Sequence, residues 1–305
     1  MSAAQKITTH LWYDREAVDA GKFYVSAFQE VFGSKPGSSG VKHISQIHDT
    51  PSGSVDIVSI ELSGQGFILI SAGPLFKFTP AVSILVSCTS KDEVEALWQK
   101  LSPGGSVLMD LGRYPFSEWY GWTQDRYGLS WQVMLARNGQ VNQRITPMMM
   151  FVGKNCGKAE EAMRFYASVF RQSAVGDIMR HGKGEDPERE GTVTYGSFTV
   201  EGKDFAAMDS AHPHNFTFNE AISFMVRCDT QQEIDYYWGK LSSDAAAEQC
   251  GWLKDRYGLS WQVTPAVLQK MLQTSDKQQL ARVTEALLTT KKFDIATLEK
   301  AYKGA

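Results

Sequence analysis

The sequence predicts an α+β protein made of two tandem copies of one domain, followed by a helical tail. The chain has 305 residues, which suits two domains of about 100–200 residues each. The segment GWTQDRYGLSWQV at 121–133 returns as GWLKDRYGLSWQV at 251–263. Helical and strand-like hydrophobic periodicities also alternate in the same order in each copy. We therefore expect domains at 1–140 and 141–265 and a tail at 266–305.

The duplication extends well beyond this shared segment, as expected for a copied domain. Three further pairs of segments match: FYVSAF (23–28) with FYASVF (165–170), SILVSC (83–88) with SFMVRC (223–228), and LWQKLS (97–102) with YWGKLS (237–242). The second copy is about ten residues shorter between its KLS and GW motifs, and we interpret this as a difference in loop length, which surface connections tolerate best.

In each copy, strands follow a first helix. Small and aromatic residues recur at helical spacing, at Ala17, Ala20, Tyr24 and Ala27 in copy one and at Ala159, Ala162, Tyr166 and Val169 in copy two. The segments that follow are rich in strand formers: VDIVSIEL (55–62), FILISAG (67–73), GTVTYGSFTV (191–200) and DFAAMDS (204–210).

A second helix follows in each copy, and its start is marked by a capping box. The boxes are Ser90 with Glu93 and Thr230 with Glu233. The apolar stripes are Val94, Leu97, Trp98 and Leu101 in one copy and Ile234, Tyr237, Trp238 and Leu241 in the other. Each copy then closes with the DRYGLSWQV strand, in which the aspartate starts a tight turn. Each copy therefore consists of two βαβββ units.

Composition excludes two classes of partner. Thirty-one basic and 34 acidic residues give a net charge of -3, without the basic surplus that nucleic-acid binding needs. No apolar run approaches the roughly 18–20 residues of a membrane span, and MSAAQKITTHLWYD lacks the features of a secretory signal. We expect a cytoplasmic protein with reduced thiols. Its cysteines are Cys88, Cys156, Cys228 and Cys250, of which the first and third match in the repeat and are predicted to be buried.

The segments KITTHLWYDREAVDAGKFYVSAF, GKNCGKAEEAMRFYASVF and CGWLKDRYGLSWQVTP resemble the PhnB-like proteins. These are often labelled as a 3-demethylubiquinone-9 3-methyltransferase domain and belong to the glyoxalase/bleomycin-resistance/dioxygenase (vicinal oxygen chelate) superfamily. The likeness covers nearly all of 6–140 and 145–265. It implies glyoxalase-like domains, in each of which two βαβββ units form a curved mixed sheet with a concave cleft and with helices on the convex face.

Strand alternation predicts which side chains line the clefts. Ser130 and Gln132 share one side of their strand, whereas Trp131 points to the other side, towards the helices. Trp122 and Trp252 precede these strands and suit the aromatic wall of a small-molecule pocket. The candidate ligand-binding residues are Ser83, Trp122, Ser130, Gln132, Asp209, Ser223, Trp252, Ser260 and Gln262. No catalytic residue stands out.

Metal-dependent proteins that this chain resembles place His, Gln or Glu ligands at four strand positions of the cleft. An approximate alignment puts Thr8, Ile70, Ser83 and Gln132 there in copy one, and Pro147, Met208 or Asp209, Ser223 and Gln262 in copy two. A neutral amide alone does not hold a divalent ion, so we predict no metal and no cofactor. His212 and His214 suit an exposed loop, and we expect His10 to face solvent or a neighbouring helix.

These observations favour a protein that binds small organic molecules without a catalytic metal. An enzyme is the alternative, either a metal-dependent lyase, isomerase or dioxygenase, or a methyltransferase as the label says. SPGGSV and SGQGF are turns and do not form the glycine-rich phosphate loop of a nucleotide fold. A third hypothesis treats the two domains as an internal pseudo-dimer with vestigial clefts, and a homodimer stays open.

The tail is predicted to form two helices. Asp276 begins one that runs to about Lys292, and Asp294 caps a second that ends near Tyr302. Helices this short are not stable alone, so we expect them to pack on the second domain or on another subunit.

Overall fold

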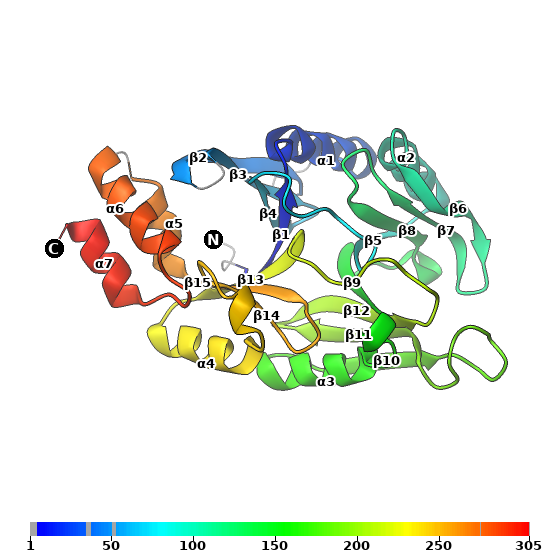
Figure 1. Cartoon of the computed structure of the whole chain (residues 1–305). Coiled ribbons are helices and arrows are strands. Elements are labelled where there is room, and N and C mark those ends of the chain that lie inside the picture. The colour runs from blue at the N-terminus through cyan, green and yellow to red at the C-terminus, as the bar shows by residue number, and fades with distance from the viewer. Residues whose placement is uncertain (1–4, 35–37, 51–52, 275, 305) are drawn as a thin grey trace.

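The computed structural model describes residues 5–34, 38–50, 53–274 and 276–304. Four structural units follow one another, each a strand, a helix and further strands, and three short helices end the chain (Figure 1). The first unit comprises β1 (Ile7–Tyr13), α1 (Ala17–Phe32), β2 (Gly40–Thr50), β3 (Gly53–Leu62) and β4 (Gln65–Ser71). The second comprises β5 (Val82–Cys88), α2 (Lys91–Leu101), β6 (Ser106–Tyr114), β7 (Ser117–Gln124) and β8 (Ser130–Leu135).

The second sequence repeat supplies the other two units and the tail. The third unit comprises β9 (Ile145–Val152), α3 (Ala159–Val169), β10 (Val175–Arg180), β11 (Val193–Val200) and β12 (Lys203–Ser210). The fourth comprises β13 (Ile222–Cys228), α4 (Gln231–Leu241), β14 (Trp252–Lys254) and β15 (Ser260–Pro265). The tail helices are α5 (Ala266–Leu272), α6 (Lys277–Leu288) and α7 (Ile295–Lys303).

The strands form two mixed sheets. Sheet A has the order β14-β15-β13-β1-β4-β3-β2, and sheet B has the order β10-β11-β12-β9-β5-β8-β7-β6. Within each unit the first strand runs parallel to the last, as β1 does to β4 and β5 to β8. Two units join where their first strands pair antiparallel, β1 with β13 and β5 with β9. The predicted α+β class, with mixed sheets and a helical tail, is confirmed.

The pairing of the units differs from the expected one, in which the two units of one repeat form a sheet together. Each sheet takes one unit from each sequence repeat, so neither repeat forms a sheet by itself. The physical reason is that every unit offers the same open edge, its first strand, and the repeated sequence does not specify which partner covers it. The boundaries at 140 and 265 therefore remain predictions about sequence repeats, which the sheets cross.

The predicted helices bury the faces that their spacing indicated. In α1 and α3 the small and aromatic positions of both stripes are buried. The hydroxyl half of each predicted capping box forms, with the Ser90 and Thr230 hydroxyls accepting from the backbone N–H of Glu93 and Glu233 at 3.2 Å. The two glutamate carboxylates accept from the N–H of the residue before each N-cap, at 2.7 Å. Helices α1 and α2 lie together on one side of the two sheets, and α3 and α4 on the other (Figure 1).

The repeated segment has the same packing role in both copies. Asp125 is buried; its Oδ2 accepts from Tyr24 Oη at 2.7 Å and from Trp131 Nε1 at 2.8 Å. Its Oδ1 accepts the backbone N–H groups of Tyr127 and Leu129. Since α1 belongs to the unit in sheet A and Asp125 to the unit in sheet B, this carboxylate joins the two units. The structural role expected for it is confirmed.

Asp255 repeats this arrangement at the other end of the molecule. It accepts from Tyr166 on α3, from Trp261, and from the backbone N–H groups of Tyr257 and Leu259, at 2.7 to 3.1 Å. Burial raises the pKa of both aspartates above the ordinary value, against the effect of these hydrogen bonds. The thirteen-residue segment therefore recurs because each copy uses it to tie its helix to the other sheet.

The length difference between the copies is a strand and not a loop, which corrects the sequence-based interpretation. The extra residues of copy one form the edge strand β6 and the start of β7. In copy two, the tail contacts this edge: the backbone N–H groups of Cys250 and Gly251 donate to Thr290 and Lys291 carbonyls at 2.8 and 2.7 Å. Gly251 has φ +82°, and a Cβ there would lie 2.4 Å from Phe293.

The tail therefore packs on the second repeat, which is one of the two expected positions. Asp276 and Asp294 cap α6 and α7 through their side chains, as predicted. Helix α5 follows β15 directly and was not expected. Among the described residues, no helix is both long enough and apolar enough to cross a membrane.

Candidate functional site

Each sheet has an inner face in the core and an outer face that the four unit helices leave uncovered. Trp131 and Trp261 belong to the inner faces and are at most 1 % exposed. Their neighbours in the strands, Ser130, Gln132 and their counterparts, point to the outer faces. The predicted alternation is confirmed, and Cys88 and Cys228 lie in the core as predicted.

The outer faces correspond position by position. In sheet A, Thr8 on β1 pairs with Met225 on β13, and in sheet B, Thr146 on β9 pairs with Leu85 on β5. Since Met225 and Leu85 match in the repeat, Thr8 and Thr146 occupy equivalent positions. The outer face of sheet A is formed by Thr8, His10, Trp12, Ile68, Ile70, Ser223, Met225, Trp252, Lys254, Ser260 and Gln262. At the same positions sheet B has Thr146, Met148, Met150, Ala206, Met208, Ser83, Leu85, Trp122, Gln124, Ser130 and Gln132.

On sheet B the polar side chains satisfy one another. Gln132 Nε2 donates to Ser83 Oγ at 2.7 Å, and Tyr120 Oη donates to Gln132 Oε1 at 2.8 Å. Trp122 Nε1 donates to Ser130 Oγ at 2.8 Å. The structure thus brings four of the predicted residues of this sheet into two hydrogen-bonded pairs. The network leaves no buried member of these pairs without a partner.

On sheet A the same network is incomplete. Gln262 Nε2 donates to Ser223 Oγ at 2.9 Å, as in sheet B. Ser260 Oγ, however, is buried without a hydrogen-bond partner, and so is Nδ1 of His10. Both residues pair with Ser223, which lies on the strand between them. Neighbouring strands are about 4.8 Å apart, so the two unpartnered groups lie on one row, roughly 10 Å apart along the sheet.

The predicted position of His10 is wrong. Its side chain faces neither solvent nor a unit helix; it is 3 % exposed and lies in the middle of the outer face of sheet A. Burial lowers the pKa of His10 to about 3, so the imidazole is neutral at ordinary pH. A buried polar atom without a partner costs about 1–3 kcal/mol, which calls for a physical explanation.

Aromatic rings frame His10. Trp252 lies edge-on to it with ring centroids 5.3 Å apart, and Trp12 lies 6.1 Å from Trp252. Phe76 packs edge-on to Trp12 at 5.0 Å. Trp12 is fixed by a hydrogen bond from its Nε1 to the Gly73 carbonyl at 2.7 Å. Apolar walls with a few directed polar groups are the usual composition of a small-molecule pocket.

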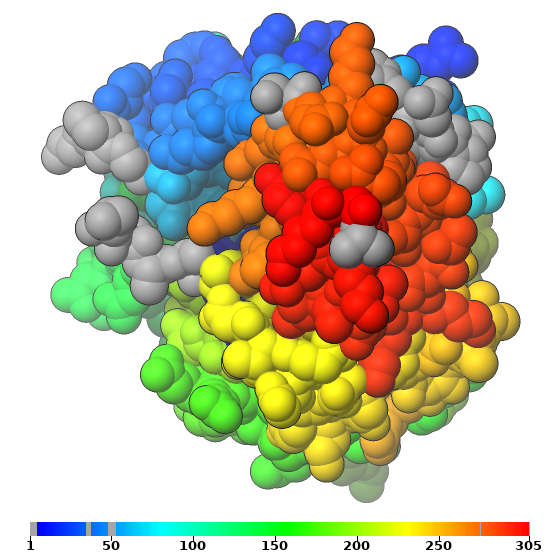
Figure 2. Space-filling model, turned by 90° about the vertical axis from the view of Figure 1, so that its left-hand side faces the viewer, coloured from blue at the N-terminus to red at the C-terminus, as the bar shows by residue number. Residues whose placement is uncertain are grey.

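Charge on this face is neutralised within the protein. Lys254 Nζ lies 2.8 Å from Glu220 Oε1, and Arg227, which follows Met225 on the same side of β13, lies 2.9 Å from Asp229 Oδ1. Figure 2 looks onto this end of the molecule. It shows a hollow beside the orange and red C-terminal helices, with dark blue atoms of the N-terminal segment inside it.

Asp209 does not join the other predicted residues. It lies on β12 in sheet B, whereas Ser223, Trp252, Ser260 and Gln262 lie in sheet A. Its carboxylate accepts the backbone N–H groups of Gly157, Ala159 and Val193 at 2.7 to 3.1 Å and so holds the start of α3. Burial raises its pKa. Its role in the structure is to support the backbone.

The four metal positions aligned within one repeat also separate. Thr8 and Ile70 lie in sheet A, and Ser83 and Gln132 in sheet B. In sheet A the spatial set is Thr8, Ile70, Ser223 and Gln262. A zinc, nickel or iron ion requires several His, Cys or carboxylate ligands, and this face offers the single imidazole of His10. The described residues contain no group of three or more such side chains placed to hold a metal. The residues present therefore do not fit a metal centre.

The loop histidines belong to a separate polar cluster. His212 Nε2 lies 3.7 Å from Glu188 Oε1, and His214 Nε2 lies 3.0 Å from Ser210 Oγ. Glu188 also accepts from Ser210 and from the Ala211 N–H. These contacts stabilise the loop after β12.

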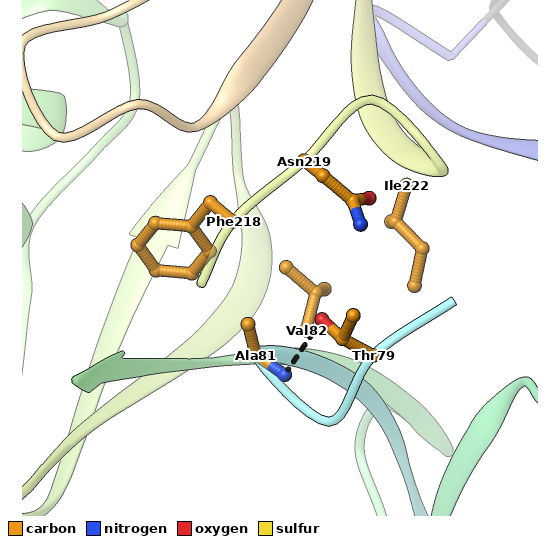
Figure 3. Close-up of a pocket in the computed structure, with 6 residues that line it drawn as sticks. All are labelled: Thr79, Ala81, Val82, Phe218, Asn219 and Ile222. Carbon is orange, nitrogen blue, oxygen red and sulfur yellow. Dashed lines mark hydrogen bonds between the residues drawn. The ribbon is translucent and has the colours of Figure 1, made fainter. Parts of the chain in front are cut away.

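A small cavity marks the junction of the two repeats (Figure 3). Residues from the same segment of each repeat line it: Thr79, Ala81, Val82, Phe218, Asn219 and Ile222. Thr79 Oγ1 accepts from the Ala81 N–H at 3.3 Å, and Asn219 Oδ1 from the Ala221 N–H at 2.8 Å. The volume is about 10 Å³, near the minimum for one water molecule, so this junction does not hold an organic ligand.

Similar proteins support the fold and the duplication. The family model described as 3-demethylubiquinone-9 3-methyltransferase matches residues 5–134 and again 143–264. A PhnB protein from Bacillus cereus is 36 % identical over 43 % of this chain and 100 % of its own, with a TM-score of 0.38. A glyoxalase I mutant from Zea mays is 10 % identical over 85 % of this chain and 94 % of its own, with a TM-score of 0.52. No curated protein matches the chain. The two tandem repeats have a glyoxalase-like fold. Because one family model covers both of them, this chain belongs to the family described as 3-demethylubiquinone-9 3-methyltransferase.

Proposed function

We propose that this protein binds a small organic molecule on the outer face of sheet A and does so without a resident metal. The observation that carries the proposal is the pair of buried, unpartnered groups, Nδ1 of His10 and Oγ of Ser260, on one row of the sheet. A ligand that hydrogen-bonds to His10, and whose binding gives Ser260 a partner, would satisfy both groups, and the aromatic rings around His10 would contact its apolar part.

The equivalent face of sheet B supports the choice of sheet A. There the residue at the position of His10 is Met148, and Ser130 already accepts a hydrogen bond from Trp122. A face whose polar groups are satisfied gains little from a ligand, whereas an unsatisfied buried group favours any partner that completes it. We therefore assign binding to one face and a structural role to the other.

Methyl transfer, which the family description names, finds less support in the local structure. Three of the four connections between a first strand and its helix are short and contain no glycine: 14–16, 89–90 and 229–230. The fourth, 153–158, gives the N–H of Gly157 to the Asp209 carboxylate. A nucleotide-type cofactor is normally held by free N–H groups of a glycine-rich connection. We therefore propose binding and assign no transfer step.

A fragment screen by ligand-observed NMR tests the proposal. A library with uncharged, anionic and cationic members is added to the full chain and to two variants, His10→Met and Met148→Leu. His10→Met gives sheet A the residue of sheet B, and Met148→Leu is the matched control on sheet B. We expect the wild type and the Met148→Leu variant to bind the same fragments, and the His10→Met variant to lose them. Fragments that bind all three proteins alike, or none, would contradict the proposal.

A further inference from the structure

Two tryptophans at equivalent positions make different contacts. Trp122 on β7 donates from Nε1 to Ser130 Oγ at 2.8 Å. Trp252 on β14 has the same register position, yet it does not donate to Ser260, whose hydroxyl is 1 % exposed and unpartnered. The hydrogen bond that completes sheet B is thus missing from sheet A, although both of its partners are present there.

The Trp252 indole is directed towards β1 instead. Its ring lies 5.3 Å from the His10 ring at an interplanar angle of 89°, and 6.1 Å from the Trp12 ring at 76°. Strand β1 is three positions from β14 in the sheet, so the indole reaches over the polar row to make these contacts. It packs edge-to-face against the imidazole ring of the unpartnered histidine.

The strands that carry the two tryptophans also differ. Trp122 lies on an eight-residue strand with β8 on one side and Met109 of β6 on the other. Trp252 begins a three-residue edge strand, and beyond β15 its backbone pairs only with Gln249 in an isolated bridge. The preceding residues Cys250 and Gly251 are hydrogen-bonded to the tail, so a movement of Trp252 is a rotation of its side chain that leaves the backbone in place.

We propose that Trp252 is a movable cover of the sheet A site, and that the ligand is an uncharged planar aromatic compound with a hydroxyl or ring N–H. This ligand would replace the indole in front of His10 and beside Trp12. Trp252 would then turn and donate to Ser260, the contact that its counterpart on sheet B already makes. The inference rests on the proposed function of the same face and specifies its ligand.

The chemical class follows from the groups that the ligand would meet. A planar ring can take over the edge-to-face contacts of the indole. Nδ1 of His10 needs one hydrogen-bond partner, and a hydroxyl or ring N–H can provide it. The cations on this face, Lys254 and Arg227, are already paired with carboxylates. A charged ligand would lose hydration without gaining a free counter-charge, so an uncharged one is favoured.

Fluorine NMR of the full chain labelled with 5-fluorotryptophan tests this directly. The Trp252 and Trp122 resonances are assigned with the Trp252→Phe and Trp122→Phe variants. The probe is 2-naphthol, compared with 2-methoxynaphthalene, 2-naphthoate and cyclohexanol. We expect 2-naphthol to move the Trp252 resonance and leave that of Trp122 unchanged. The three comparison compounds should bind about tenfold more weakly or worse, as expected for loss of one good hydrogen bond or of ring contacts.

The Ser260→Ala variant tests the movement of Trp252 separately from ligand binding at the sheet A site. If Trp252 moves as proposed, this variant binds 2-naphthol about three- to tenfold more weakly, because the turned indole has no Ser260 hydroxyl to which it can donate. Ser130→Ala is the matched control on sheet B and leaves binding unchanged. If 2-naphthol binds wild type and Ser260→Ala equally, with a stationary Trp252 resonance, the cover is overturned while the proposed function stands. If cyclohexanol or 2-naphthoate binds as well as 2-naphthol, the ligand class is overturned. If His10→Met binds 2-naphthol as wild type does, the proposed function itself fails.

Discussion

The outer faces of sheets A and B share a framework and differ in whether it is complete. Both have two serines, a glutamine and a tryptophan at matching positions. On sheet B, the hydrogen bonds among Trp122, Ser130, Gln132 and Tyr120 satisfy the face. On sheet A a histidine stands where sheet B has Met148, and its Nδ1 has no partner. The difference shows that two faces with the same framework can differ in whether their polar groups find partners within the protein.

The buried aspartates test how far the two halves are alike, and their removal is the largest effect that we expect. Asp125→Ala and Asp255→Ala each leave four hydrogen-bond donors without their acceptor. We expect each to lower the free energy of unfolding by about 4 kcal/mol, measured by urea denaturation. Equal losses would show that the two halves differ in their outer faces and not in the contacts of the buried aspartates. A loss below about 1 kcal/mol in either variant would contradict the structural role of that aspartate.

The second-largest effect that we expect is a pH dependence of stability that distinguishes the two faces. The pKa of His10 is lowered from 6.5 to about 3 in the folded protein, and burial is the cause. The stability that His10 gives by staying neutral is present above pH 6.5 and is lost as the pH falls towards 3. The slope approaches about 1.4 kcal/mol per pH unit.

Between pH 6 and pH 4, the wild type should therefore lose about 2 kcal/mol more free energy of unfolding than the His10→Met variant. Urea denaturation at both pH values measures this, and the shared titrations of other groups cancel in the comparison. The Met148→Leu variant serves as the control and should follow the wild type. Parallel pH profiles for wild type and His10→Met would show that His10 is not buried as described.

The two serines at one register position should give small effects of opposite sign. Ser130→Ala removes the acceptor of the Trp122 indole and should cost about 1 kcal/mol. Ser260→Ala removes a buried hydroxyl that has no partner, so stability should stay unchanged or rise by up to about 1 kcal/mol. Thermal unfolding of the two variants side by side measures the difference. A loss in Ser260→Ala as large as that in Ser130→Ala would mean that Ser260 has a partner in solution.

Local sequence patterns predicted most of the fold because they act over a few residues. The stripe that contains Tyr24, the N-cap at Ser90 and the turn at Asp125 all involve near neighbours, and all three are confirmed. The pairing of units across the repeats was not predictable, because β1 and β5 present equivalent open edges. The extra strand β6 was missed because exposed edge residues give little hydrophobic pattern.

Half of the site followed from alternation and half did not. Ser260 and Gln262 were placed on the correct face because side chains in a strand alternate. His10 was missed since its surroundings come from β13, β14 and β15, more than two hundred residues away in the sequence. One signal was available in the sequence, because the equivalent position in the second repeat is the apolar residue Met148. A histidine at a position where the other repeat has a methionine is worth testing as a site residue.

A crystal structure of the full chain soaked with 2-naphthol tests the central claim most directly. We predict ligand density on sheet A alone, with its hydroxyl within hydrogen-bond distance of His10 Nδ1, its ring beside Trp12, and Trp252 turned towards Ser260. Density on sheet B at Gln132, or an unliganded sheet A with His10 still unpartnered at saturating 2-naphthol, would contradict the assignment of binding to this face.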